Sequence, residues 1–233
     1  MMKQELSKRI QTSVLNAAEK EVLVWLAQRQ PRWITSDILT AIGVVGALVV
    51  AAGYILSTYH IGWLWLSSLG FLINWYGDSL DGTLARVRGT QRPIYGFYLD
   101  HNIDGVTMAI MCLGAGMSHL LCLYIAMGVL AVYLLLSISV YINAHLKGEF
   151  KLTYAGMGPT EFRLIMIGVN TLFYFIAPLR EWTMHFAFAR ISITLGAFDL
   201  VGLFVLVVLC IIYLNNFVHD AEGYAKIDPE KPY

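Results

Sequence analysis

The chain has 233 residues, of which 58% are hydrophobic and only 14% are charged, and its mean hydropathy is +0.62. Its 16 basic and 16 acidic residues balance, so the charge gives no basis for nucleic-acid binding. Several apolar runs approach the roughly 20 residues that span a bilayer, which makes a soluble globular protein the poorer interpretation.

We expect no cleavable signal in the first thirty residues, because they lack the apolar core and small-residue cleavage site that a signal needs. Apolar residues recur there at helical spacing, which predicts an amphipathic helix over residues 1–30 that lies on the membrane surface. A helix docked on the protein's own core is the alternative interpretation. The apolar stripe consists of Leu6, Ile10, Val14, Ala18, Val22 and Trp25.

Six apolar stretches follow, and we expect them to cross the membrane as helices of one domain over residues 31–218. A helix that starts near Pro93 extends the third span, and residues 219–233 form a polar tail. The predicted fold is therefore an all-α integral membrane protein with six transmembrane helices after an interfacial helix. The predicted spans are Ile34–Tyr59, Ile61–Asp81, Ile103–His119, Leu120–Ala144, Phe162–Pro178 and Ile191–Phe217.

The placement of lysine and arginine predicts the orientation of these spans, because cytoplasmic loops retain positive charge during insertion. With both termini in the cytosol, 14 of the 16 basic residues lie inside, and only Arg180 and Arg190 lie outside. The inverted topology is clearly worse. We therefore expect both termini to be cytosolic.

Four aspartates stand within one 27-residue stretch of this apolar chain: Asp78, Asp81, Asp100 and Asp104. An aspartate at the centre of a bilayer costs roughly 2.5 to 3.5 kcal/mol, so four that faced lipid would cost on the order of 10 kcal/mol. They must therefore face a polar cavity.

Helix geometry predicts that the two pairs of aspartates meet. Asp78 and Asp81 are three residues apart, and Asp100 and Asp104 are four apart, so each pair shares one helix face. The segment between the pairs is too short to cross a bilayer and makes a poor continuous helix, so we expect the chain to turn back near Gly89. Both pairs then lie roughly 10 to 12 Å from the turn, on the cytosolic side.

Clustered carboxylates select hard divalent cations, Mg²⁺ or Mn²⁺, over zinc, which favours histidine or cysteine ligands. We expect two ions, because a paired-metal site can bind a diphosphate, polarise phosphorus and stabilise a leaving oxygen. Gly82 and Ala85 leave space for a bulky ligand such as a nucleotide beside these carboxylates. Arg86 can then interact with phosphate charge.

The segment from Asp78 to Asp104 resembles the signature of the CDP-alcohol phosphotransferase (CDP-alcohol phosphatidyltransferase) family. That signature is D-x2-D-G-x2-A-R, eight or nine residues, and then G-x3-D-x3-D. Every fixed position is filled, and the longer permitted spacing separates Arg86 from Gly96. Six spans and a preceding amphipathic helix also resemble the family.

The resemblance implies that the hydroxyl of an acceptor alcohol displaces CMP from a CDP-linked alcohol, in a catalytic domain that opens to the cytosol. It implies that all four aspartates ligate metal and that Asp104 also takes the acceptor's proton. A homodimer, and phospholipid biosynthesis in a bacterial inner membrane, follow from the same resemblance. The residues that would hold the CDP-linked donor are Gly82, Ala85, Arg86 and Arg92.

Two further places are predicted to bind substrate. The family often carries Pro-Asn-x-x-Thr where this chain reads Ser36-Asp37-Ile-Leu-Thr40. We predict Asp37 and Thr40 as nucleotide contacts, with a helix N-cap as the alternative for Ser36 or Asp37. We also predict that Arg163, which follows a possible helix start at Thr160 or Gly158, receives a phosphate of the donor or of a phosphorylated acceptor.

Three hypotheses of function remain open. The favoured one is phosphatidyl transfer from CDP-diacylglycerol to a small alcohol, whose identity the shared signature does not reveal. The second uses CDP-choline or CDP-ethanolamine as donor and diacylglycerol as acceptor, in a group that usually has more spans. A cation transporter is the non-enzyme alternative, since intramembrane carboxylates also mark ion paths, but it does not explain the other fixed residues of the signature.

Overall fold

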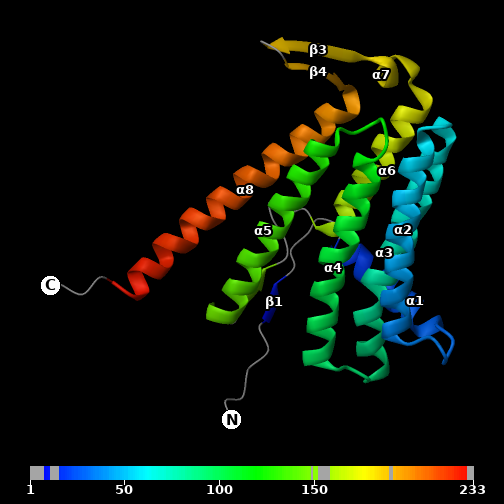
Figure 1. Ribbon diagram of the computed structural model, residues 1–233. Helices are drawn as coiled ribbons and strands as arrows, with labels where there is room; N and C mark the ends of the chain where they lie inside the picture. Colours follow the sequence, from blue (N-terminus) through cyan, green and yellow to red (C-terminus); the bar gives the residue numbers. More distant parts are fainter. Residues whose placement is uncertain (1–7, 11–15, 148, 152–157, 189–190, 230–233) are drawn as a thin grey trace.

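The computed structural model describes residues 8–10, 16–147, 149–151, 158–188 and 191–229, and most of them form a bundle of long helices (Figure 1). The all-α class is confirmed, with four short strands beside the helices in the described part of the chain. The long helices are α2 (Ser36–Ser57), α3 (Leu64–Arg88), α4 (Pro93–Gly116), α5 (Leu123–Lys147), α6 (Pro159–Phe175) and α8 (Ala197–Ile227). The shorter elements are β1 (Lys8–Ile10), α1 (Asn16–Arg29), the 3₁₀ turn η1 (Ile61–Trp63), β2 (Glu149–Lys151), α7 (Ala177–Glu181), β3 (Thr183–Phe188) and β4 (Ile191–Gly196).

Three helices in the described residues are long and apolar enough to cross a membrane. They are α2, α8 and the part of α5 from Leu123 to Leu146. The other long helices are less clearly membrane-spanning, because α3 and α4 each carry two of the aspartates and α6 has only 17 residues. The apolar helices agree with an integral membrane protein, and the number of six spans stays a prediction.

Glycines allow α2 and α3 to pack backbone against backbone. A Cβ added to Gly46 would lie 2.3 Å from the backbone nitrogen of Asn74, and one added to Gly77 would lie 2.3 Å from that of Gly43. Small residues permit this close approach between membrane helices. The side-chain amide of Asn74 also donates a hydrogen bond to the carbonyl of Gly43, at 2.9 Å. Gly114 brings α4 against α2 in the same way.

A tight turn joins α3 to α4. Gly89 ends α3 with a left-handed backbone, φ 65°, and the amide of Thr90 donates to the carbonyl of Ala85 at 3.0 Å. Pro93 is the first residue of α4, a position where its missing N–H costs nothing. The predicted turn near Gly89 and the predicted helix start near Pro93 are both confirmed.

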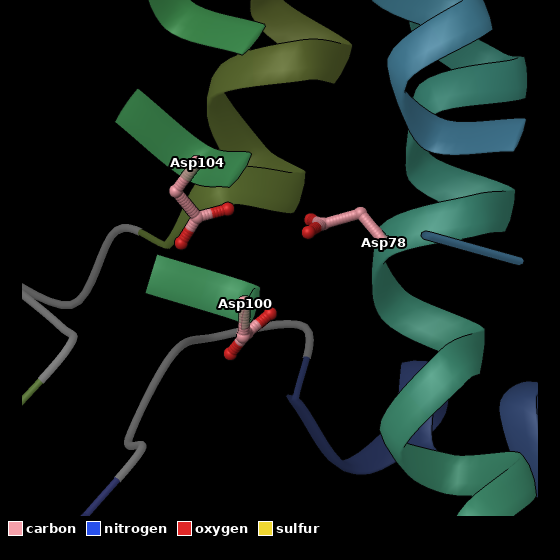
Figure 2. Close-up of side chains that lie close together, drawn as sticks. All are labelled: Asp78, Asp100 and Asp104. Carbon is pink, nitrogen blue, oxygen red and sulfur yellow. The ribbon is translucent and has the colours of Figure 1, made fainter. Parts of the chain in front are cut away.

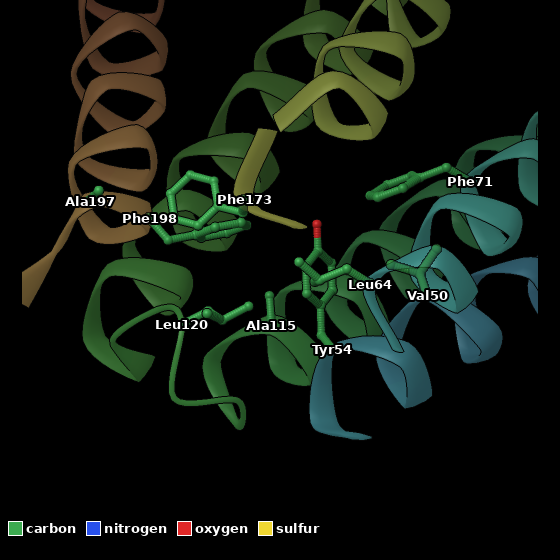
Figure 3. Packing of buried hydrophobic residues seen from close by; sticks show 9 residues of the cluster. All are labelled: Val50, Tyr54, Leu64, Phe71, Ala115, Leu120, Phe173, Ala197 and Phe198. Carbon is green, nitrogen blue, oxygen red and sulfur yellow. The ribbon is translucent and has the colours of Figure 1, made fainter. Parts of the chain in front are cut away.

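The largest buried cluster lies at the opposite end of the bundle and joins α2, α3, α4, α6 and α8 (Figure 3). The ring of Tyr54 packs edge-on against Phe71 and Phe198, with centroids 6.4 and 5.9 Å away. The hydroxyl of Tyr54 donates to Oδ1 of Asn170 at 3.0 Å, which gives this buried polar group a partner. The cluster consists of Val50, Tyr54, Leu64, Phe71, Ala115, Leu120, Phe173, Ala197 and Phe198.

Asp199 fixes the start of α8 to the loop before α5. Its buried carboxylate accepts hydrogen bonds from the backbone amides of Cys122, at 2.6 Å, and Gly196, at 2.8 Å. A buried carboxylate needs such donors to offset its lost hydration. Asp199 therefore has a structural role at this end of the molecule.

The predicted helix over residues 1–30 is wrong in its first part. Lys8–Ile10 forms β1, which pairs in parallel with β2, and α1 begins only at Asn16. The pairing gives the backbone of this segment partners on another strand in place of the helical ones. Residues 1–7 and 11–15 of the prediction, with Leu6 and Val14 of the stripe, lie outside the described residues.

The face of α1 that packs on the bundle also differs from the predicted stripe. Leu23 and Ala27 are buried in a cluster with Leu80 and other residues of α2 and α3. Val22 and Trp25 are instead about half exposed, at 47% and 53%. The alternative interpretation, a helix docked on the protein's own core, is therefore confirmed for α1, and placement of its outer face at a membrane surface stays a prediction.

The predicted sixth span, Ile191–Phe217, begins too early, and its helix extends beyond the predicted end. Ile191–Gly196 forms β4, antiparallel to β3, and α8 runs from Ala197 to Ile227. The apolar run marks where hydrophobic residues stop, whereas the helix continues through polar residues that also favour helix. The first nine residues of the predicted polar tail, 219–227, are consequently helical.

Candidate active site

Three of the four aspartates converge between α3 and α4. Asp78 of α3 and the pair Asp100 and Asp104 of α4 point toward one another (Figure 2). One carboxylate oxygen of each lies within 4.8 Å of the others, and all three side chains are partly buried. Oxygen atoms so arranged suit a hard divalent cation, so this group fits the predicted metal chemistry.

The turn at Gly89 sets the relative height of the three carboxylates. Asp78 lies about three helical turns before that glycine, and Asp100 and Asp104 lie two to three turns after Pro93. Because α3 and α4 run antiparallel from the turn, equal distances along each helix bring the side chains to the same level. The convergence predicted from helix geometry is confirmed for these three residues.

Asp81 is not part of this group. Its Oδ2 accepts a hydrogen bond from Oγ1 of Thr40 at 2.6 Å, and its backbone carbonyl accepts one from Oγ of Ser36 at 2.9 Å. The side chain still lies within electrostatic reach of Asp78 and Asp100. Asp81 thus faces α2, and its role as a metal ligand stays a prediction.

Arg163 of α6 interacts directly with the carboxylate group. Its Nη2 lies 2.5 Å from a carboxylate oxygen of Asp78, and its Nε donates to Oδ1 of Asn74 at 2.9 Å. Its Nη1 is buried and makes no hydrogen bond within the described residues. A buried donor without an acceptor costs free energy, so an anionic ligand within reach of Nη1 would be stabilised.

The predicted donor-binding face of α3 is open at Gly82. A Cβ added there would meet only the flexible side chain of Arg86, with Nη1 at 3.3 Å. Arg86 is exposed and donates from Nη2 to Oγ1 of Thr83 at 2.8 Å, and Ala85 is partly exposed. No backbone atom restricts this face near Gly82, which agrees with the predicted space for a nucleotide.

Arg92 and Asp37, both predicted to contact substrate, form an ion pair at 2.5 Å. Their side chains are 55% and 45% exposed, and exposed pairs contribute little to stability. The hydrogen bond from the guanidinium to Asp37 raises the pKa of Arg92 above its ordinary value. The structure thus brings these two residues together next to the α3–α4 turn, where a ligand can exchange for either partner.

The first residues of α2 and α6 test two of the predictions made from the sequence. The N-cap of α2 is Thr35, whose backbone is extended and whose side chain accepts the amide hydrogen of Ile38 at 3.3 Å. The N-cap interpretation of Ser36 or Asp37 is therefore wrong. Of the two possible starts of α6, Thr160 and Gly158, the structure has Gly158 as the N-cap, and Glu161 accepts its amide hydrogen at 2.9 Å.

Asn74 is a site residue that sequence reasoning missed. It is buried, and its amide joins the backbone of α2 to the side chain of Arg163. Its spacing from Asp78 could have indicated this role, because Asn74 lies one helical turn before Asp78 and shares its face. A small cavity next to the carboxylates is lined partly by Asn74, Asp78, Asp100 and Thr40.

Comparison with known proteins agrees with these observations. A family model described as CDP-alcohol phosphatidyltransferase matches residues 33–208, about three quarters of the chain. A phosphatidylinositol phosphate synthase of Cutibacterium acnes (strain DSM 16379 / KPA171202) is 35% identical over 71 residues, which are 30% of this chain and 32% of that protein. The match thus spans less than a third of the relative's length.

Proposed function

The chain belongs to the CDP-alcohol phosphatidyltransferase family, and from this premise we propose that it transfers a phosphatidyl group from CDP-diacylglycerol to the hydroxyl of an acceptor alcohol. The acceptor oxygen bonds to the phosphorus that carries diacylglycerol, and the bond from that phosphorus to the CMP oxygen breaks. The acceptor's proton passes to Asp104, and CMP leaves. The product is a phospholipid.

The observation that carries this proposal is the convergence of Asp78, Asp100 and Asp104 beside the open face of α3. These residues would hold Mg²⁺ or Mn²⁺, and Asp81 would join them if two ions bind. The positive charge of the bound ions would offset the negative charge of the diphosphate. Asp104 is the proposed base, since a carboxylate next to the reacting hydroxyl can take a proton that becomes more acidic as the oxygen attacks phosphorus.

The donor's place follows from the open face near Gly82. A nucleotide diphosphate lying along α3 from Asp78 toward the turn would pass Gly82 and Ala85 and meet the positive charges of Arg86 and Arg92. Guanidinium groups suit phosphate oxygens because their N–H donors match phosphate geometry. Asp37 already forms an ion pair with Arg92. A bound donor phosphate would therefore either replace Asp37 or join the pair.

Arg163 is the proposed phosphate ligand on the other side of the carboxylates. Its buried Nη1 has hydrogen-bonding capacity that the described residues do not use. A phosphate of the donor, or a phosphate on the acceptor, would use it. The partial match to a phosphatidylinositol phosphate synthase makes a phosphorylated inositol the first acceptor to test.

The proposed setting is a bacterial inner membrane, with both ends of the chain and the carboxylates on the cytosolic side. The asymmetry of basic residues supports this orientation, and Asp78, Asp100 and Asp104 lie about two to three helical turns from the α3–α4 turn. A CDP-linked lipid would then enter from the inner leaflet and a polar acceptor from the cytosol. A homodimer is proposed by analogy with the family alone.

The decisive experiment supplies the purified protein, in vesicles, with CDP-diacylglycerol, Mg²⁺ or Mn²⁺, and a panel of alcohols. The panel contains serine, glycerol 3-phosphate, inositol and inositol phosphate. We expect CMP release with one acceptor, no release in the presence of a metal chelator, and a single new phospholipid. A parallel reaction with CDP-choline or CDP-ethanolamine and diacylglycerol tests the reverse assignment of the lipid. Absence of CMP release with every pair would contradict the proposal, and cation flux without CMP release would favour a transporter.

A further inference from the structure

The ribbon formed by β3 and β4 separates large apolar positions from polar or small ones along both strands. The antiparallel register pairs Met184 with Leu195 and His185 with Thr194, and this alternation continues to the pair of Phe188 and Ile191. Paired positions share one face of a ribbon, and the faces alternate along each strand. One face has the positions Met184, Phe186, Phe188, Ile191, Ile193 and Leu195, and the other has Thr183, His185, Ala187, Ser192, Thr194 and Gly196.

The contacts near the base of the ribbon agree with this division. Nδ1 of His185 lies 2.8 Å from Oγ1 of Thr194, so these exposed polar groups meet across the strands. On the other face, the side chain of Met184 is 38% exposed despite being apolar. Trp182, directly before β3, is 39% exposed, and tryptophan is enriched at membrane–water interfaces.

One end of the ribbon lies directly next to the start of α8. Gly196 is the last residue of β4, and α8, a candidate membrane span, starts at the next residue, Ala197. The hydrogen bond from the amide of Gly196 to Asp199 ties this junction to the first turn of the helix. With no linker between them, a bilayer that contains α8 has its surface next to the ribbon.

The direction of the ribbon keeps it near the level at which α8 begins. Figure 1 shows β3 and β4 running sideways across the end of the bundle, not along a helix. Six residues of strand extend about 20 Å. A two-stranded ribbon is marginally stable in water by itself, and burial of a large apolar side chain contributes roughly 1.5 to 3 kcal/mol. A lipid surface beneath the apolar positions would supply that burial.

We propose that the β3–β4 ribbon is an interfacial membrane anchor. Its apolar face, on the side of Met184 and Leu195, lies in the boundary between lipid headgroups and acyl chains, and its polar face, on the side of Thr183 and Thr194, meets water. The anchor sits at the end of the bundle opposite the α3–α4 turn and restricts the tilt and depth of α8. It requires that the chain spans a membrane, and it does not depend on the proposed reaction.

Four single-cysteine variants test this anchor in matched neighbouring pairs. Spin labels are attached at M184C and L195C on one face and at T183C and T194C on the other, after replacement of Cys112, Cys122 and Cys210. The protein is reconstituted in vesicles of phosphatidylethanolamine and phosphatidylglycerol. Collision of each label with oxygen, which concentrates in lipid, is compared with collision with a water-soluble nickel chelate. Thermal unfolding at the parent's temperature shows that each variant is folded.

We expect the labels at positions 184 and 195 to favour oxygen over nickel by several-fold, and the labels at 183 and 194 to show the reverse. Nickel access at all four positions would overturn the anchor, because both faces would then lie in water. Protection of 184 and 195 from both reagents would also overturn it, because a protein surface, such as a second copy of the chain, would then cover the apolar face.

Discussion

Helices α2 and α3 pack backbone against backbone, whereas α5 and α8 meet mainly through side chains. On α2, a Cβ added to Gly46 would lie 2.3 Å from the backbone of Asn74, and that backbone cannot move aside. On α5, a Cβ added to Gly128 would first meet the end of the Leu206 side chain, at 3.2 Å. Toward its C-terminus α8 also leans away from the bundle (Figure 1), and Phe204 on it is 70% exposed.

The location of the carboxylates follows this difference. All four aspartates lie on α3 and α4, the helices that pack closely against α2, and the polar contacts of Asn74 and Thr40 add to that packing. Metal and phosphate chemistry needs ligands held within a fraction of an ångström, which rigid backbone contacts provide. Helix α8 carries none of these aspartates, and the side chains between it and α5 fix the spacing of these two helices less strictly than backbone contacts would. The predictions below test this contrast.

The largest effect is expected from Asp104→Asn, which removes the proposed base while keeping the size of the side chain. Loss of a positioned base costs about 10²- to 10⁴-fold in rate, so CMP release should fall by at least two orders of magnitude. Thermal unfolding should stay close to that of the parent, since the substitution leaves the packing of α2 and α3 in place. CMP release and unfolding temperature are measured on the same preparation.

The matched control is Asp228→Asn, which changes the same residue type at an exposed position after α8. It should release CMP at the parent rate. Near-parent turnover by Asp104→Asn would remove this residue from the mechanism. Equal loss in both variants would show that the effect is not specific to the carboxylate group.

Arg163→Gln should have the next largest effect. Hydrogen bonds to charged groups contribute about 1.5 to 3 kcal/mol, so loss of one to a substrate phosphate should lower kcat/KM by roughly 10- to 150-fold. The loss should appear in KM of the phosphate-bearing substrate at saturating metal. Arg163→Lys keeps the charge without the forked donors and should recover part of the activity. If only the metal concentration at half-maximal activity changes, Arg163 acts through its ion pair with Asp78 alone.

Gly46→Ala tests the close packing itself. The added methyl group would collide with the backbone of Asn74, and overpacking of this kind costs about 1 to 3 kcal/mol. We expect a lower unfolding temperature, and with it a lower rate of CMP release, because the movement separates α2 from the helix that carries Asp78. An unchanged unfolding temperature would mean that α2 and α3 are farther apart than the structure shows.

The sequence predicted the parts of the site that depend on local spacing. Helical periodicity placed Asp100 and Asp104 on one face, and the glycine and proline between the pairs marked the turn that brings Asp78 to them. It did not predict that Asp81 would turn to Thr40, or that Arg163 would pair with Asp78. Those contacts join residues 41 and 85 positions apart, so they depend on how separate helices pack.

The sequence of the β3–β4 ribbon has the alternating pattern of strands, but the overall hydrophobicity of the segment outweighed that pattern in the prediction. Residues 183–188 and 191–196 alternate apolar with polar or small residues, which is typical of a strand. The long apolar run of α8 begins directly afterwards, so total hydrophobicity favoured one span from Ile191. The period of the pattern was the better guide to the boundary at Ala197.

Thr40→Val should have a smaller effect that is specific to Asp81. Valine keeps the shape of threonine but cannot donate the 2.6 Å hydrogen bond to the Asp81 carboxylate. If Asp81 is a metal ligand, loss of a group that orients it should weaken apparent metal affinity about 10- to 100-fold at unchanged KM for the donor. Thr40→Ser keeps the hydroxyl and should behave as the parent. A change in KM for the donor alone would instead support direct contact of Thr40 with the nucleotide.

The smallest effect is expected from Gly128→Ala, the counterpart of Gly46→Ala on the side of α5 and α8. The added methyl group meets only the flexible end of Leu206, which can rotate away, and alanine favours a helix by up to about 1 kcal/mol over glycine. The free energy of unfolding should therefore stay within about 0.5 kcal/mol of the parent's or rise slightly, with CMP release unchanged. Because both variants add one methyl group to a glycine in an apolar helix, the difference between them isolates the packing at each interface. Equal destabilisation by the two would contradict the contrast, since it would mean that α5 and α8 are held together as closely as α2 and α3.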